Sequence, residues 1–132
     1  MEKLTKEQIE KAVNWWADRV AAPIFDGLSK EERKDPVNDG YQMAEVLANL
    51  LVKPVDITAR EKFIDALREE LQKENTRATW GLFTDYGPDA ILDDVANKAG
   101  ISLNNFPWKT CMWFKDGKVI VALGYAAEQV EI

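Results

Sequence analysis

The side chains in this sequence best placed to do chemistry are the carboxylates of residues 85–94, DYGPDAILDD. This segment holds four acids and no base, namely Asp85, Asp89, Asp93 and Asp94. Asp89 and Asp93 are four residues apart, which places them on one face of a helix. Carboxylates grouped in this way could hold Mg²⁺ or Ca²⁺, although their spacing matches no calcium-binding loop.

Two other interpretations of these acids compete with a metal site. In the first, Asp85 caps or precedes a helix, Asp89 favours the positive N-terminal end of that helix, and Asp93 and Asp94 are surface charges. In the second, the acids face a basic partner, and complementary charge speeds and steers the association. We expect no metal and no cofactor, and we take all four acids as candidate partner-binding residues.

The groups that most enzymes use for catalysis are missing elsewhere in the chain. There is no histidine, which excludes Ser-His-Asp and Cys-His catalysis and every histidine-containing zinc site. Cys111, the single cysteine, lies in the apolar stretch KTCMWF, where an inert thiol is expected. The glycines are scattered and form no phosphate-binding loop. The sequence therefore predicts a protein that is not an enzyme.

Size, cysteine content and charge further limit the class of protein to which this chain can belong. With 132 residues, of which 46% are hydrophobic, the chain predicts a single domain over residues 1–132. We expect no signal peptide, because residues 1–11 are charged and lack an apolar core, and no apolar stretch is long enough to cross a bilayer. One cysteine cannot form an internal disulfide. We therefore expect a cytoplasmic protein without membrane contact. The net charge of −6 disfavours direct binding of nucleic acid, which requires a basic surface.

Three helices are predicted in the N-terminal half of the chain, over residues 6–21, 39–52 and 58–74. Thr5 and Gln8 form a capping box at the start of the first helix. The apolar residues of the second helix cover most of its circumference, so we expect this helix to be central in the fold. They are Tyr41, Met43, Ala44, Val46, Leu47, Ala48, Leu50 and Leu51.

The C-terminal half adds strands and a fourth helix. A short strand is predicted over residues 78–84, and Gly87-Pro88 then opens a helix with Pro88 at its first position and Gly100 as its C-terminal cap. Asp116-Gly117 joins two strands, 109–115 and 118–125, into a hairpin. This order predicts an α+β fold: three N-terminal helices, a short strand, a fourth helix and a C-terminal β-hairpin that forms a small antiparallel sheet.

The predicted hairpin has two apolar faces. Pairing around the turn aligns Trp113 with Ile120, so that Cys111, Trp113, Ile120 and Ala122 share one face and Met112, Phe114, Val119, Val121 and Leu123 share the other. A sheet covered on one side normally alternates apolar and polar residues. Either both faces are covered, one of them by the first helix, or one face is an interface, for example in a homodimer.

Three tryptophans are candidate anchors for a partner. Trp15 and Trp16 lie about 100° apart on a helix, so they cannot both face one core. Trp16 belongs to the apolar stripe of the first helix and Trp15 does not. Because tryptophan is enriched at binding hot spots, we expect Trp15, Trp108 and Trp113 to contact a partner.

Two stretches, VNWWADRV near the start and NFPWKTCMWFKDGKVIVALGY near the end, resemble small accessory proteins encoded by bacteriophages and prophages of enteric bacteria. The resemblance implies an anti-defence protein of the anti-CRISPR kind, which binds and inhibits a host protein in the bacterial cytoplasm without catalysis. A basic, nucleic-acid-binding defence complex is one such host partner. The alternative is a phage structural or assembly protein that forms homo-oligomers.

Overall fold

The computed structural model describes residues 4–22, 34–73, 76–78, 80–124 and 127–132 of the chain. Four α-helices are present in this part, namely α1 (Lys6–Ala21), α3 (Asp39–Leu51), α4 (Ile57–Gln72) and α5 (Ala90–Ala99). The described strands are β1 (Gly81–Phe83), β2 (Thr110–Lys115), β3 (Lys118–Leu123) and β4 (Val130–Glu131). They form one antiparallel sheet in the order β1-β2-β3-β4. The mixed architecture confirms the predicted α+β class.

The first helix begins where its capping box predicts. Thr5 Oγ1 accepts a hydrogen bond from the backbone N–H of Gln8 at 3.0 Å, and Gln8 Oε1 accepts one from the backbone N–H of Thr5 at 2.8 Å. Gln8 is also buried, and its Nε2 donates to the carbonyl oxygen of Lys118 at 3.0 Å. One side chain thus caps α1 and attaches it to the turn between β2 and β3.

The hairpin register is as predicted, while the extent of the sheet differs from the prediction. Trp113 pairs with Ile120, and the turn residues Asp116 and Gly117 have φ values of 52° and 75°. Such positive values at both positions are typical of a type I′ turn. The expected strand over 78–84 contracts to the three residues of β1, and β4 was not predicted because the apolar alternation in EQVEI covers only Val130 and Ile132.

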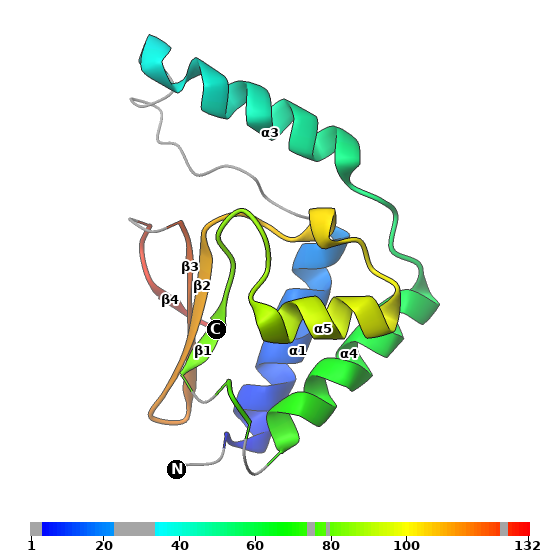
Figure 1. The fold of residues 1–132 in the computed structure, drawn as a ribbon. Helices are drawn as coiled ribbons and strands as arrows, with labels where there is room; N and C mark the ends of the chain where they lie inside the picture. Colours follow the sequence, from blue (N-terminus) through cyan, green and yellow to red (C-terminus); the bar gives the residue numbers. More distant parts are fainter. Residues whose placement is uncertain (1–3, 23–33, 74–75, 79, 125–126) are drawn as a thin grey trace.

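The core lies between one face of the sheet and three helices. Figure 1 shows α1, α4 and α5 on the same side of the strands. Phe106 lies at the centre of this layer, with its ring centroid 6.3 Å from that of Trp16 on α1 and 6.2 Å from that of Phe63 on α4. Leu82 of β1 and Met112 of β2 contribute from the sheet, and both are fully buried.

The second predicted helix is not central, which corrects our expectation. Among the described residues, α3 follows directly on the 3-10 helix η1 (Pro36–Asn38), lies apart from the helix–sheet block (Figure 1) and meets it at the 3-10 helix η2 (Leu103–Asn105). Ala48 is its buried apolar side chain, while five larger ones are between 54% and 76% exposed. They are Met43, Val46, Leu47, Leu50 and Leu51, and we call them the α3 stripe. The side chain of Tyr41 lies outside the described part.

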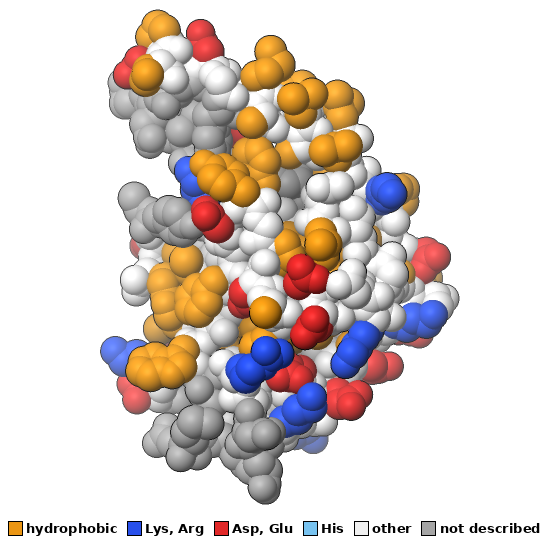
Figure 2. Space-filling view, in the orientation of Figure 1, with side chains coloured by type: hydrophobic (Ala, Val, Ile, Leu, Met, Phe, Trp, Pro, Cys, Tyr) orange, Lys and Arg blue, Asp and Glu red, His pale blue; other side chains and the backbone are white. Residues whose placement is uncertain are grey.

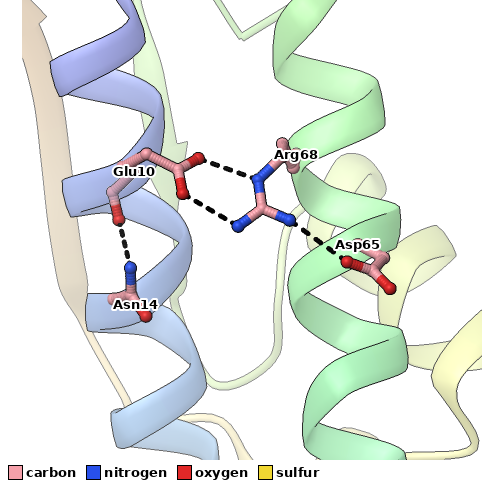
Figure 3. A network of polar contacts seen from close by, with 4 residues as sticks. All are labelled: Glu10, Asn14, Asp65 and Arg68. Carbon is pink, nitrogen blue, oxygen red and sulfur yellow. Dashed lines mark hydrogen bonds and ion pairs between the residues drawn. The ribbon is translucent and has the colours of Figure 1, made fainter.

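Charged side chains join α1 to α4 at two places. Arg68 donates from Nε and Nη2 to the two carboxylate oxygens of Glu10, each at 2.8 Å, and from Nη1 to Asp65 at 3.1 Å (Figure 3). Arg60 pairs with Asp18 at 2.7 Å further along the same interface. The hydrogen bonds from Arg68, more than its charge, lower the pKa of Glu10 from its ordinary value of 4.5. A bidentate pair of this kind fixes the relative position of the two helices.

Replacing Glu10 with glutamine is expected to make stability less dependent on pH. The pKa of Glu10 is lower in the folded chain than in the unfolded chain. The ionised carboxylate therefore stabilises the fold fully when the pH of the solution is above the ordinary pKa of 4.5. This stabilisation is lost as the pH falls through the pKa of the folded state. Glu10 is partly exposed, so the loss at pH 7 is at most about 1 kcal/mol. Urea unfolding between pH 7 and 3 measures this difference.

In that experiment, the stability difference between wild type and Glu10→Gln should shrink as the solution is acidified. Glu7→Gln is the matched control, because Glu7 forms an exposed pair with Lys11 within the same helix. A Glu10→Gln difference that stays constant across the whole pH range would contradict the assignment.

Candidate partner-binding surface

One face of the sheet carries apolar side chains and no described helix. Phe83, Cys111, Trp113, Ile120 and Ala122 share this face, which we call the outer face. Ala122 is buried and the other four are partly exposed. Figure 1 shows α1, α4 and α5 on the opposite side, so no described helix covers the outer face.

Aromatic rings form the centre of the outer face. The ring centroids of Phe83 and Trp113 lie 6.3 Å apart in an edge-to-face arrangement, which is a favoured geometry for aromatic pairs. Figure 2 shows hydrophobic side chains gathered on the sheet side of the molecule and again along α3. The outer face is therefore preorganised by its own ring contacts.

A groove of about 330 Å³ connects the outer face to the acidic segment. Its lining includes Phe83 and Cys111 from the strands and Asp85 and Asp89 from the loop between β1 and α5. Asp85 is exposed, and its carbonyl oxygen accepts a hydrogen bond from the backbone N–H of Lys109 at 2.7 Å. The loop is thus held against the start of β2, and the carboxylate of Asp85 lies at the rim of the outer face.

Trp108 belongs to the same end of the sheet. Its ring packs edge-to-face on that of Tyr86 at 5.3 Å, and the Nζ atom of Lys109 lies 5.3 Å from the same Tyr86 ring. Trp108 is partly exposed, whereas Tyr86 is 58% exposed. The structure therefore brings Asp85 and Trp108 to one end of the sheet and adds Tyr86, while Trp113 is linked to this end through its ring contact with Phe83, which lines the same groove as Asp85.

Asp89 lies beside this region, but its carboxylate is used within the fold. It is the N-cap of α5, where Oδ1 accepts from the backbone N–H of Leu92 at 2.9 Å. Oδ2 accepts from the backbone N–H of Phe83 at 2.9 Å, and the N–H of Asp89 donates to the carbonyl oxygen of Phe83 at 3.0 Å. This corrects the expectation that Pro88 is the first residue of the helix. Asp89 thus caps the N-terminus of α5 and also accepts a hydrogen bond from the backbone N–H of Phe83 at the free edge of β1.

Substituting Asp89 with alanine is expected to lower the free energy of unfolding by about 2 kcal/mol. The reason is that two backbone N–H groups, of Leu92 and Phe83, lose their acceptor. Asp89→Asn should cost less, because one amide oxygen still accepts. Asp93→Ala is the control, since Asp93 bonds only the exposed Asn97 side chain among the interactions described. Chemical denaturation measures the free energy of unfolding of the three variants. Equal losses of stability in Asp89→Ala and Asp93→Ala would refute the capping role of Asp89.

The other two acids lie on α5, away from the outer face. Asp93 Oδ1 accepts from Asn97 Nδ2 at 2.8 Å, and Asp94 lies 3.6 Å from Arg77 in an exposed pair. Asp94 lines a groove between α4 and α5 together with Lys98 and other charged residues. The four acids of the segment therefore do not form one patch.

Trp15 also lies away from the outer face. Its ring packs edge-to-face on Trp16 at 4.9 Å, and the guanidinium of Arg19 lies 5.1 Å from its centroid. It borders a groove whose other walls include Val121 and Val130, on the helix side of the sheet. Trp15 thus packs beside α1 against the β3–β4 end of the sheet, partly exposed, and is separated from Trp113 by the sheet itself.

Trp80 is an exposed aromatic residue that the sequence analysis did not select as a site. It precedes β1 and is 82% exposed. Its carbonyl oxygen accepts from the backbone N–H of Phe114, so the residue is attached to the sheet although its ring is in solvent. No local signal in the sequence distinguishes it from the buried tryptophan Trp16.

Cys111 and the acidic side chains are the remaining candidates for chemistry among the described residues. Burial raises the pKa of the Cys111 thiol, which lowers its thiolate fraction at neutral pH. Within the described ranges, no three His, Cys, Asp or Glu side chains are grouped to hold a metal ion. Each described helix also falls short of the length and apolar character of a membrane span.

Comparison with known proteins gives no further assignment, since no family model, no curated protein and no solved structure matches this chain. The fold and the surface together define a class. This is an α+β protein in which α1, α4 and α5 lie on one side of an antiparallel sheet, while the other face presents partly exposed aromatic side chains.

Proposed function

We propose that this chain is a non-catalytic protein-binding domain, and that its outer face contacts the partner. The observation that carries the proposal is the apolar character of a sheet face that no described helix covers. Apolar patches of this kind on a soluble domain mark sites of association. Trp113 and Phe83 form the anchor, and Tyr86, Trp108 and the carboxylate of Asp85 form its rim.

The class of partner follows from charge and from the resemblance of the sequence. The carboxylate of Asp85 at the rim favours a partner with a basic residue opposite it, because complementary charge raises the association rate. The resemblance to phage accessory proteins supports a host defence protein in the bacterial cytoplasm, which this chain would inhibit by occupying its surface. In this proposal Asp93, Asp94 and Trp15 are no longer contact residues, and Asp89 acts by holding the rim in place.

Affinity capture from a lysate of enteric bacteria tests the proposal. Tagged wild-type chain should recover a stoichiometric partner, and the variant Trp113→Thr/Ile120→Thr should not. The control is Ile57→Thr at the start of α4, which removes an apolar side chain that is 75% exposed and does not belong to the outer face. Asp85→Asn should retain the partner but with an affinity that depends less on salt. Equal recovery by wild type and the outer-face variant would reject the proposal.

A further inference from the structure

The exposed α3 stripe is a second apolar surface, separate from the outer face. Its spacing places Met43, Val46, Leu47 and Leu50 on one side of the helix, as in helices that pair along a seam. The small residues Ala44 and Ala48 lie toward the protein side of the same helix. A helix whose larger apolar residues face solvent requires a partner for that face.

We propose that a second copy of this chain covers the stripe, with the two α3 helices packed antiparallel about a two-fold axis. The axis passes between Val46 and Leu47, so that Met43 of each copy lies opposite Leu50 of the other. A two-fold interface must be complementary to itself, and this stripe satisfies that condition because it is apolar along its whole length.

Charge at the two ends of α3 supports the same arrangement. Asp39 is the first residue of the helix, and Lys53 follows its last residue by two positions. Both are exposed. In the antiparallel pair, Asp39 of each copy lies near Lys53 of the other, and the two contacts are equivalent by symmetry. A membrane surface is a poorer occupant, because α3 contains Asp39 and Glu45 and neither lysine nor arginine.

The chain just after α3 is attached to the fold. Asn105 accepts a hydrogen bond from the backbone N–H of Lys53 at 2.8 Å and donates to its carbonyl oxygen at 2.6 Å. The C-terminal end of the helix that carries the stripe is thus held close to η2. The five side chains of the α3 stripe provide less surface per copy than the roughly 800 Å² of a standard interface, so the dimer is expected to dissociate in the micromolar range.

Sedimentation equilibrium of the purified full chain, from about 1 to 300 µM, tests the pairing without any other protein. Wild type should show a monomer–dimer equilibrium. Leu50→Glu should weaken it about 30-fold or more, because each dimer loses the contact twice. Ile57→Glu is the control for an exposed apolar residue outside the stripe and should leave the equilibrium unchanged. Circular dichroism checks that both variants fold.

Charge reversal then tests the antiparallel alignment. Asp39→Lys and Lys53→Asp should each weaken the dimer, and the double variant should restore it. A chain that remains monomeric throughout the range assigns the stripe to another occupant and overturns the proposal. So does a dimer that tolerates Leu50→Glu but is lost in Trp113→Thr/Ile120→Thr. These outcomes do not depend on whether the outer face binds a host protein.

Discussion

Replacing Gly81 with alanine is expected to lower the free energy of unfolding by about 4 kcal/mol. Gly81 has a φ of 153°, a conformation that residues with a Cβ rarely adopt. A Cβ at this position would overlap the carbonyl oxygen of Met112 on the adjacent strand. To remove this overlap, β1 must move away from β2, and this movement withdraws Leu82 from the core. Guanidinium unfolding followed by circular dichroism measures the loss.

The matched control is Gly87→Ala in the loop between β1 and α5. No described atom lies within 4 Å of a Cβ built there, so the substitution should change stability little. If Gly81→Ala and Gly87→Ala unfolded at the same denaturant concentration, the close approach of β1 to β2 would be wrong. The same experiment bears on function, because β1 supplies Phe83 to the outer face.

Asn105→Ala is expected to cost about 4 kcal/mol, since three hydrogen bonds of a buried side chain are lost together. Asn105 is fully buried in η2 and connects two distant segments. Besides its two bonds to Lys53, its Nδ2 donates to the carbonyl oxygen of Val20 near the end of α1 at 3.0 Å. The alanine variant leaves these backbone groups without their partner. Thermal and chemical unfolding both report the loss.

Two further variants separate the effect of the lost hydrogen bonds from the effect of the smaller side chain volume at position 105. Asn105→Asp keeps an acceptor for the N–H of Lys53 but places a carboxylate against the carbonyl oxygens of Val20 and Lys53, so we expect it to be no better than alanine. Asn104→Ala, at the exposed neighbouring position, should stay within about 0.5 kcal/mol of wild type. A stable Asn105→Asp protein would show that the bonds are not as assigned.

Local patterns in the sequence were sufficient to predict much of the fold. Thr5 and Gln8 predict the start of α1, and Asp116-Gly117 predicts the hairpin register, because both signals act within a few residues. Gly100 likewise ends α5 in the left-handed conformation that the sequence suggests, with φ of 73°. In each case, the interaction that decides the structure is between near neighbours in the chain.

Features that depend on distant segments could not be predicted. The apolar pattern of α3 indicates that the helix has an apolar face, but not what covers it. Asn105 is an ordinary polar residue in the sequence, and its importance appears only when α1 and the segment after α3 meet it. Similarly, the acids of residues 85–94 look like one patch until Asp89 is seen to bond the edge of β1.

The candidate site was predicted in part for the same reason. The hairpin register placed Trp113 and Cys111 on one face, and the structure leaves that face without a described helix. The sequence could not separate Trp113 from Trp15, because the sheet that lies between them is assembled from three segments. Phe83 and Tyr86 were not selected, since their neighbours in space come from β2 and from Trp108.

The accessibility of Cys111 tests most directly whether a partner covers the outer face, because the only cysteine of the chain lies on that face. The alkylation rate of this thiol would be measured by mass spectrometry at mildly alkaline pH, in the free chain and in the captured complex. We predict measurable alkylation of the free chain and at least about tenfold slower reaction in the complex, as expected for a residue covered by an interface. Equal rates in the two states would contradict the account.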